Sequence, residues 1–169
     1  MKKQLSVFRV LTFVLVPFAG LFAMMSVFSL LVALANPAAL ISGFMMVAFV
    51  IYTFTSLAFL TRGIDAGRPL KASLRDWIRV NAFVSAFMAG LSILEMVIFA
   101  LMDDAVLRDY INKSLEGQSN LPPMVNTAFF LTVIKIIVGF MAVLSVILLT
   151  HIVLNFRLMK AYRHLFQQP

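Results

Sequence analysis

Four long apolar runs occupy most of this 169-residue chain, and they limit what the chain can fold into. They cover residues 10–35, 40–60, 80–102 and 125–150. A helix of about 20 residues, rising about 1.5 Å per residue, crosses the hydrocarbon core of a bilayer. Because lipid offers no hydrogen-bond partner, a crossing segment must satisfy its own backbone groups, as a helix does. The runs therefore predict an all-α integral membrane protein with four transmembrane helices.

Composition favours one membrane domain over residues 1–169, with no separate soluble domain. Hydrophobic residues make up 62% of the chain and charged residues 12%. In a typical soluble domain the charged residues alone make up about 25%. The chain has no cysteine, which excludes disulfides, thiolate metal sites and a cysteine nucleophile.

The basic residues outside the runs predict how the chain is threaded. They concentrate in the N-terminal stretch, the loop 61–79 and the C-terminal tail, as Lys2, Lys3, Arg9, Arg62, Arg68, Lys71, Arg75, Arg79, Arg157, Lys160 and Arg163. The outer loop 103–124 holds only Arg108 and Lys113. Since basic loops stay in the cytoplasm, we expect both termini and the loop 61–79 there. The prediction is an antiparallel four-helix transmembrane bundle, N-in and C-in, in the plasma or inner membrane.

The first run has an alternative interpretation as a cleaved signal peptide. Basic residues precede it, and Ala33-Leu34-Ala35 matches a cleavage-site pattern. However, the run is about twice as long as the usual apolar region of 7–15 residues in a signal peptide, and Arg9 interrupts its start. We therefore expect this span to be retained, and the intact mass of the protein distinguishes the two cases.

Local signals mark the joints between the runs. Asn36-Pro37 predicts a tight turn that makes the first two spans a helical hairpin, because proline lacks a backbone donor and restricts its predecessor. Ser73 and Asp76 match a capping box, which predicts that the third helix starts at Ser73. Trp77, one turn further, is expected to lie at the membrane interface.

Residues 103–116 predict a short amphipathic helix outside the membrane. Apolar residues recur there at helical spacing, while the charged residues fall mostly on the other face. Two roles stay open for this helix: it covers its own bundle, or it presents a surface to a partner.

Two charged residues lie deep in the apolar runs: Glu95 in the third and Lys135 in the fourth. A charge at the bilayer centre costs at least about 2.5–3.5 kcal/mol, so each needs a partner. Glu95 and Lys135 are expected at similar depths on antiparallel helices, with side chains that lean toward each other. We predict an intramembrane ion pair, which serves either to fix helix register or to form an ion or proton path.

Small residues predict close helix contacts, within the chain or in self-association. Ala82, Ala86 and Gly90 recur at four-residue spacing in the third run, and Gly139 lies near Lys135 in the fourth. Small residues at such spacing let membrane helices approach closely.

The remaining polar residues in the runs suggest packing more than chemistry. His151 and His164 are isolated in the sequence, and haem ligation within one chain would need two histidines at matching depths. We expect each to be an interfacial histidine near anionic headgroups, with a haem shared through His151 in a dimer as the alternative. Tyr52 and Ser56, with the threonines between them, are interpreted as packing groups, because hydroxyls often bond back to their own helix.

No pattern for a nucleophile with a base, a metal centre or a phosphate loop appears in the sequence. We therefore expect a non-enzymatic accessory or scaffold subunit of a membrane complex, without a cofactor. The alternative is a small transporter or ion-conducting oligomer that uses Glu95 and Lys135. The expected partners are a protein or a second copy, and anionic lipid headgroups rather than nucleic acid. The expected headgroup contacts are Arg62, Arg68, Lys71, Arg75, Trp77, Arg79, Arg157, Lys160 and Arg163.

Overall fold

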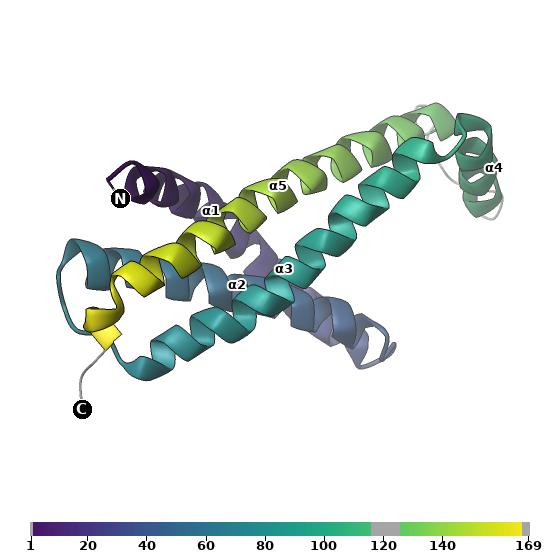
Figure 1. Ribbon diagram of the computed structural model, residues 1–169. Helices are drawn as coiled ribbons and strands as arrows, with labels where there is room; N and C mark the ends of the chain where they lie inside the picture. Colours follow the sequence, from purple (N-terminus) through teal and green to yellow (C-terminus); the bar gives the residue numbers. More distant parts are fainter. Residues whose placement is uncertain (1, 116–125, 167–169) are drawn as a thin grey trace. The chain divides into compact units, whose positions relative to one another are not determined.

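The computed structural model describes residues 2–115 and 126–166 of the chain, and these residues are helical apart from short joints (Figure 1). In chain order the elements are α1 (Lys2–Ala33), α2 (Ala39–Ala58), η1 (Phe59–Asp65), α3 (Ala72–Leu101), α4 (Asp104–Leu115), α5 (Thr127–Ala161) and η2 (Arg163–Phe166). No strand occurs among the described residues. The predicted all-α class is therefore confirmed.

Among the described residues, four helical stretches are long and apolar enough to cross a membrane. They are Lys2–Ala33, Ala39–Asp65, Ala72–Leu101 and Thr127–Ala161. Each contains most of one predicted run, and all four extend beyond it into a neighbouring basic segment. These four helices indicate a multi-pass membrane protein.

The chain divides into two compact units. The first unit comprises Met1–Met88 and Ile147–Pro169, and the second comprises Ala89–Val146. The long helices α3 and α5 each contribute one part to each unit.

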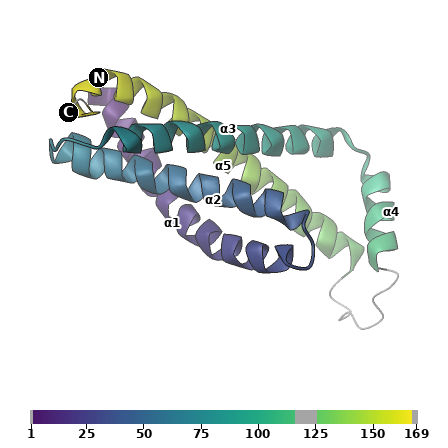
Figure 2. The ribbon, with the colours of Figure 1, turned by 90° about the horizontal axis from the view of Figure 1, so that it is seen from below.

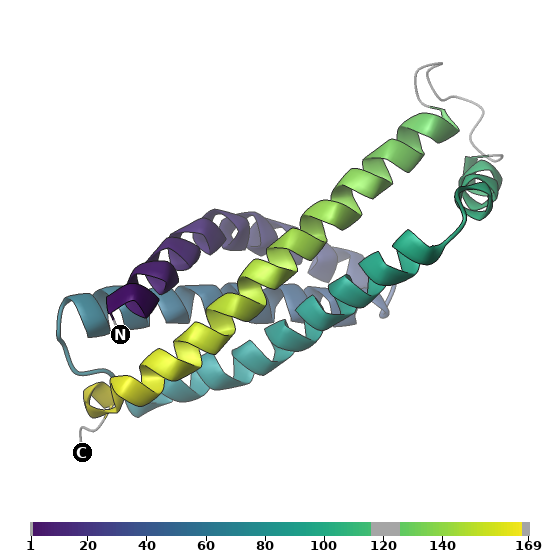
Figure 3. The same ribbon diagram turned by 45° about the horizontal axis from the view of Figure 1, so that its top comes forward.

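In the first unit, α1 and α2 form the expected hairpin (Figure 2). The turn begins after Ala33, where the Asn36 side chain accepts a hydrogen bond from the Ala38 backbone N–H at 3.2 Å. Gly43 allows close approach, since an added Cβ would lie 3.2 Å from Ser29 Oγ. Helix α1 continues through Pro17 and curves along α2 (Figure 3).

The segment between α2 and α3 starts with η1, a π-helix of seven residues. Gly67 has a φ of +60°, a backbone angle that glycine adopts without strain. The Leu70 N–H donates to the Leu165 carbonyl in η2 at 2.7 Å, which fixes this segment against the end of the chain. Helix α3 begins at Ala72, so Ser73 lies in its first turn and is not the N-cap that the sequence predicts.

In the second unit, α4 confirms the predicted amphipathic helix. Its buried residues Leu107 and Ile111 pack on Leu131 of α5. The Asp103 carboxylate accepts a hydrogen bond from the Ala105 N–H at 2.9 Å and so caps the start of the helix. Within this unit, α4 therefore covers its neighbouring helix, as the first of the two expected roles requires. Residue 116, the last of the predicted amphipathic helix, lies outside the described residues.

Candidate functional site

The first unit contains a buried cluster of polar side chains. They come from three helices and are each at most 1% exposed: Thr12 of α1, Tyr52 and Ser56 of α2, and His151 and Asn155 of α5. We call these five residues the polar cluster. Polar groups removed from water or placed in lipid are costly unless they bond to one another.

The donor and the acceptor of each hydrogen bond in the polar cluster can be assigned consistently. The Thr12 hydroxyl donates to the Phe8 carbonyl at 2.8 Å, so its oxygen is left to accept from His151 Nε2–H at 2.9 Å. His151 Nδ1 then accepts from the Tyr52 hydroxyl at 2.7 Å. We infer this tautomer from the network, because a neutral imidazole has one donor and one acceptor.

Asn155 completes the polar cluster. Its Nδ2 donates to Ser56 Oγ at 2.7 Å and, more weakly, to Tyr52 Oη at 3.4 Å. The result is an uncharged chain of bonds from Asn155 through Tyr52 and His151 to Thr12, which joins α1, α2 and α5.

Aromatic rings enclose His151. The Phe8 ring stacks on it at 4.6 Å between centroids, and the Tyr52 ring meets it edge-on at 5.5 Å. Both imidazole nitrogens are hydrogen-bonded, so neither is free to bind a metal or haem iron. No group of three His, Cys, Asp or Glu residues able to hold a metal ion occurs in the described part of the chain. The hydrogen bonds of the polar cluster link α1, α2 and α5.

The sequence alone does not predict the polar cluster, whose residues come from three separate helices. One signal was available: Tyr52 and Ser56 in α2, and His151 and Asn155 in α5, are both separated by four residues. Residues four apart share a helix face. Two such polar pairs within apolar runs indicate a polar face on each helix, and these two polar faces can pack against each other.

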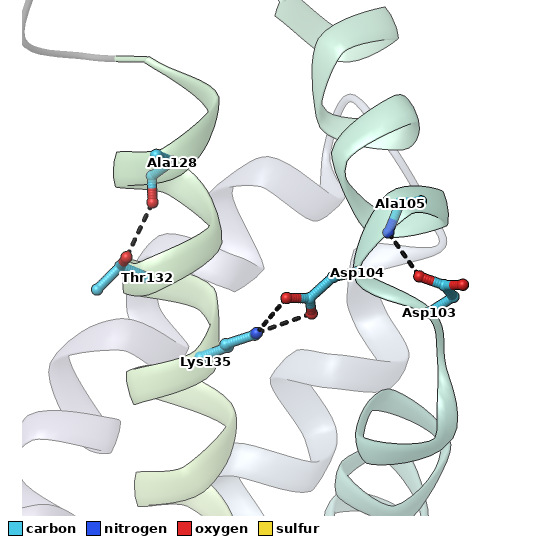
Figure 4. A network of polar contacts seen from close by, with 6 residues as sticks. All are labelled: Asp103, Asp104, Ala105, Ala128, Thr132 and Lys135. Carbon is cyan, nitrogen blue, oxygen red and sulfur yellow. Dashed lines mark hydrogen bonds and ion pairs between the residues drawn. The ribbon is translucent and has the colours of Figure 1, made fainter.

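In the second unit, Lys135 is bonded to Asp104, the first residue of α4 (Figure 4). Its Nζ lies 2.8 Å from one carboxylate oxygen and 3.1 Å from the other. The hydrogen bond that Lys135 donates is the main cause that lowers the pKa of the Asp104 carboxyl below its usual range. The positive charge of Lys135 is the second cause. Both side chains are about half exposed.

The predicted Glu95–Lys135 pair is therefore corrected. Glu95 is exposed on α3 and makes no ion pair within residues 2–115 and 126–166. The physical reason lies in the direction of Lys135, whose side chain leans toward the start of α5. This lean brings the ammonium to α4, where Asp104 lies in the first helical turn.

The small residues differ in their surroundings. Ala82 is buried, with 1% exposure, and Ala86 is partly buried. An added Cβ at Gly90 or Gly139 would meet no atom within 4 Å. Neither glycine is thus needed for a close contact in this structure, and a role for these residues in self-association stays a prediction.

Several of the expected headgroup contacts gather in the first unit. Arg62, Arg68, Lys71 and Trp77 line one cavity of about 500 Å³. Four others are exposed: Arg79, Arg157, Lys160 and Arg163. Arg75 lies 3.5 Å from Asp76. Binding of lipid headgroups by these residues stays a prediction.

Comparison with family models, with curated proteins and with solved structures finds no match for this chain. The class that the helices indicate is a multi-pass membrane protein.

Proposed function

We propose that this chain is a non-enzymatic accessory or scaffold subunit of a membrane complex. It lies in the plasma or inner membrane, with both termini on the cytoplasmic side. The observation that carries the proposal is the Glu95 carboxyl on α3, which is exposed and makes no ion pair among residues 2–115 and 126–166. It is the only charged residue between Val80 and Met102. A carboxyl at such a position needs a hydrogen-bond donor or a cation, since lipid supplies neither.

The surroundings of Glu95 favour a helical partner. Leu94, Val97 and Ile98 are each about half exposed, so apolar area surrounds the carboxyl. Membrane helices associate through packing of such surfaces and through polar contacts between helices. A partner helix that offers Lys, Arg, His or an amide would satisfy Glu95.

A different chain suits this surface better than a second copy. In a two-fold dimer the same patch meets itself, which would bring two Glu95 carboxyls together. Two carboxylates in one site repel each other unless they share a proton. Electrostatic repulsion therefore favours a mixed complex over a homodimer at this surface.

The polar cluster supports a structural role for the first unit. Its histidine is uncharged and fully hydrogen-bonded, so it is suited to fixing the positions of α1, α2 and α5 rather than to proton transfer. A scaffold subunit needs such a fixed core.

The second candidate function is a cation-conducting oligomer. It is favoured by the same unpaired Glu95, because rings of acidic side chains select cations in channels. Lys135 does not belong to this path, since Asp104 already neutralises it.

Purification of the full chain from its native membrane in mild detergent tests the proposal. A photo-crosslinking residue at Leu94 should capture one defined partner, and Glu95→Leu should abolish both capture and co-purification. The control Asp76→Leu removes an acid near the start of the same helix and should change neither. Capture that is unaffected by Glu95→Leu would contradict the proposal. Glu95-dependent cation flux into vesicles by the protein alone would instead favour the channel.

A further inference from the structure

The cavity at the start of α3 is lined by both basic and apolar side chains, a combination that can bind a ligand. It is lined by Arg62, Arg68 and Lys71 together with the apolar side chains of Leu74 and Trp77. We call it the basic pocket. All of its residues belong to the first unit, and its volume is about 500 Å³.

The backbone holds the cations of the basic pocket in place. The Arg68 N–H donates to the Arg62 carbonyl at 3.3 Å, which keeps these two residues adjacent. Leu70 is bonded to Leu165 and packs so closely on Gly63 that an added Cβ there would lie 2.5 Å from Leu70 Cδ1. The loop is thus fixed before any ligand arrives, which lowers the entropic cost of binding.

The positive charge of the basic pocket is not neutralised by nearby acids. Asp65 pairs with Arg9, and Asp76 pairs with Arg75. In the described part of the chain, Arg62, Arg68 and Lys71 make no ion pair. Guanidinium groups bind phosphate oxygens through paired hydrogen bonds. Three uncompensated cations around one cavity therefore fit a phosphate-bearing anion.

An apolar track leads away from the basic pocket along α3. Its residues are spaced as on one helix face and are 55–69% exposed: Trp77, Val80, Phe83 and Phe87. A second cavity, of about 290 Å³, lies against Trp77 and Val80. A ligand that fills both features has a phosphate at one end and a hydrocarbon chain at the other.

We propose that the basic pocket binds one anionic phospholipid, with its headgroup phosphate on Arg62, Arg68 and Lys71 and an acyl chain on the track from Trp77. This ligand site goes beyond the proposed function and does not depend on it. Charge complementarity selects the headgroup, and the exposed aromatic track selects a lipid over a soluble phosphate compound.

Trp77 provides a direct reporter, because it is the only tryptophan in the chain. The full chain is reconstituted into zwitterionic vesicles that contain a small fraction of anionic lipid with brominated acyl chains. Bromine quenches a tryptophan in contact with it. We expect stronger quenching by brominated anionic lipid than by the same fraction of brominated zwitterionic lipid.

Matched variants distinguish binding at the basic pocket from general electrostatic attraction to an anionic membrane surface. Arg62→Gln, Arg68→Gln and Lys71→Gln together should weaken the preference for anionic lipid, by about fivefold for each charge that contacts the headgroup. The control carries Lys2→Gln, Lys3→Gln and Arg108→Gln, which remove the same net charge outside the basic pocket, and should keep the preference. Arg68→Gln alone, on an exposed loop, provides a milder variant if the triple variant does not fold.

Three outcomes would overturn the proposal. Equal quenching by both brominated lipids, or an equal loss in the pocket and control variants, means that the surface lacks a specific site. Relief of quenching by inorganic phosphate, compared with chloride at the same ionic strength, means that a soluble phosphate compound is the ligand.

Discussion

The polar groups of the two units differ in charge and in exposure. In the first unit the polar cluster is uncharged, almost completely buried and bonded within itself. In the second unit Lys135 and Asp104 are charged and about half exposed. Neutral groups can be buried at modest cost when they are hydrogen-bonded, whereas charges are costly to bury even as pairs. Stability should therefore depend strongly on the polar cluster and weakly on the ion pair.

The largest effect is expected from His151→Ala. This change removes two hydrogen bonds, leaves the Tyr52 hydroxyl without its acceptor, and opens a cavity beneath Phe8. We expect a loss of about 3 kcal/mol in the free energy of unfolding. Thermal unfolding in detergent measures it. The control His164→Ala alters an exposed histidine and should change little. Equal effects of the two variants would show that the polar cluster does not stabilise the first unit.

A smaller effect is expected from Tyr52→Phe. It keeps the ring but removes the hydroxyl that donates to His151 Nδ1. One lost bond in a membrane helix core should cost about 1 kcal/mol. Tyr110→Phe is the matched control, since Tyr110 is 73% exposed. If both variants unfold at the wild-type temperature, the hydrogen-bond order described for the polar cluster is wrong.

A double-mutant cycle tests which acid partners Lys135. Asp104→Asn and Lys135→Met should show a coupling that is favourable but smaller than the effect of Tyr52→Phe, because the pair is half exposed. Glu95→Gln combined with Lys135→Met should give additive effects. Coupling in the second cycle and none in the first would restore the pairing expected from the sequence.

The smallest effect is a pH dependence in the second unit. A carboxyl with a lowered folded pKa stabilises the fold above its unfolded pKa of about 3.9, and this contribution is lost as pH falls through the folded value. Lys135→Met should raise the pKa of Asp104 toward about 3.9, since Lys135 is the main cause of the lowering. Carbon-13 NMR of labelled Asp carboxyls measures it. Lys113→Met, which removes the partner of Asp109, should leave the Asp104 titration unchanged.

Features set by local sequence were predictable. Run length predicted the four apolar helices, Asn36-Pro37 predicted the hairpin turn, and apolar spacing predicted α4. Each depends on residues close together in the chain, for which helical periodicity and proline sterics suffice.

Features set by the rotation of one helix against another were not predictable. The polar cluster requires Thr12, Tyr52 and His151 to face one point from three helices. Lys135 selects Asp104 because of where α4 starts after the apolar run. Depth along a helix can be counted from the sequence, but the facing direction depends on side-chain packing across the unit.

Cysteine labelling tests the central claim most directly, namely that four helices cross the membrane and leave both termini and the loop 61–79 on the cytoplasmic side. The natural chain has no cysteine, so single variants at Arg68, Asp109 and Lys160 give unambiguous signals with an impermeant thiol reagent. The account predicts that the cysteine at position 109 reacts from outside in intact cells, and that those at 68 and 160 react only after the membrane is opened. Labelling of positions 68 and 160 from opposite sides would contradict it.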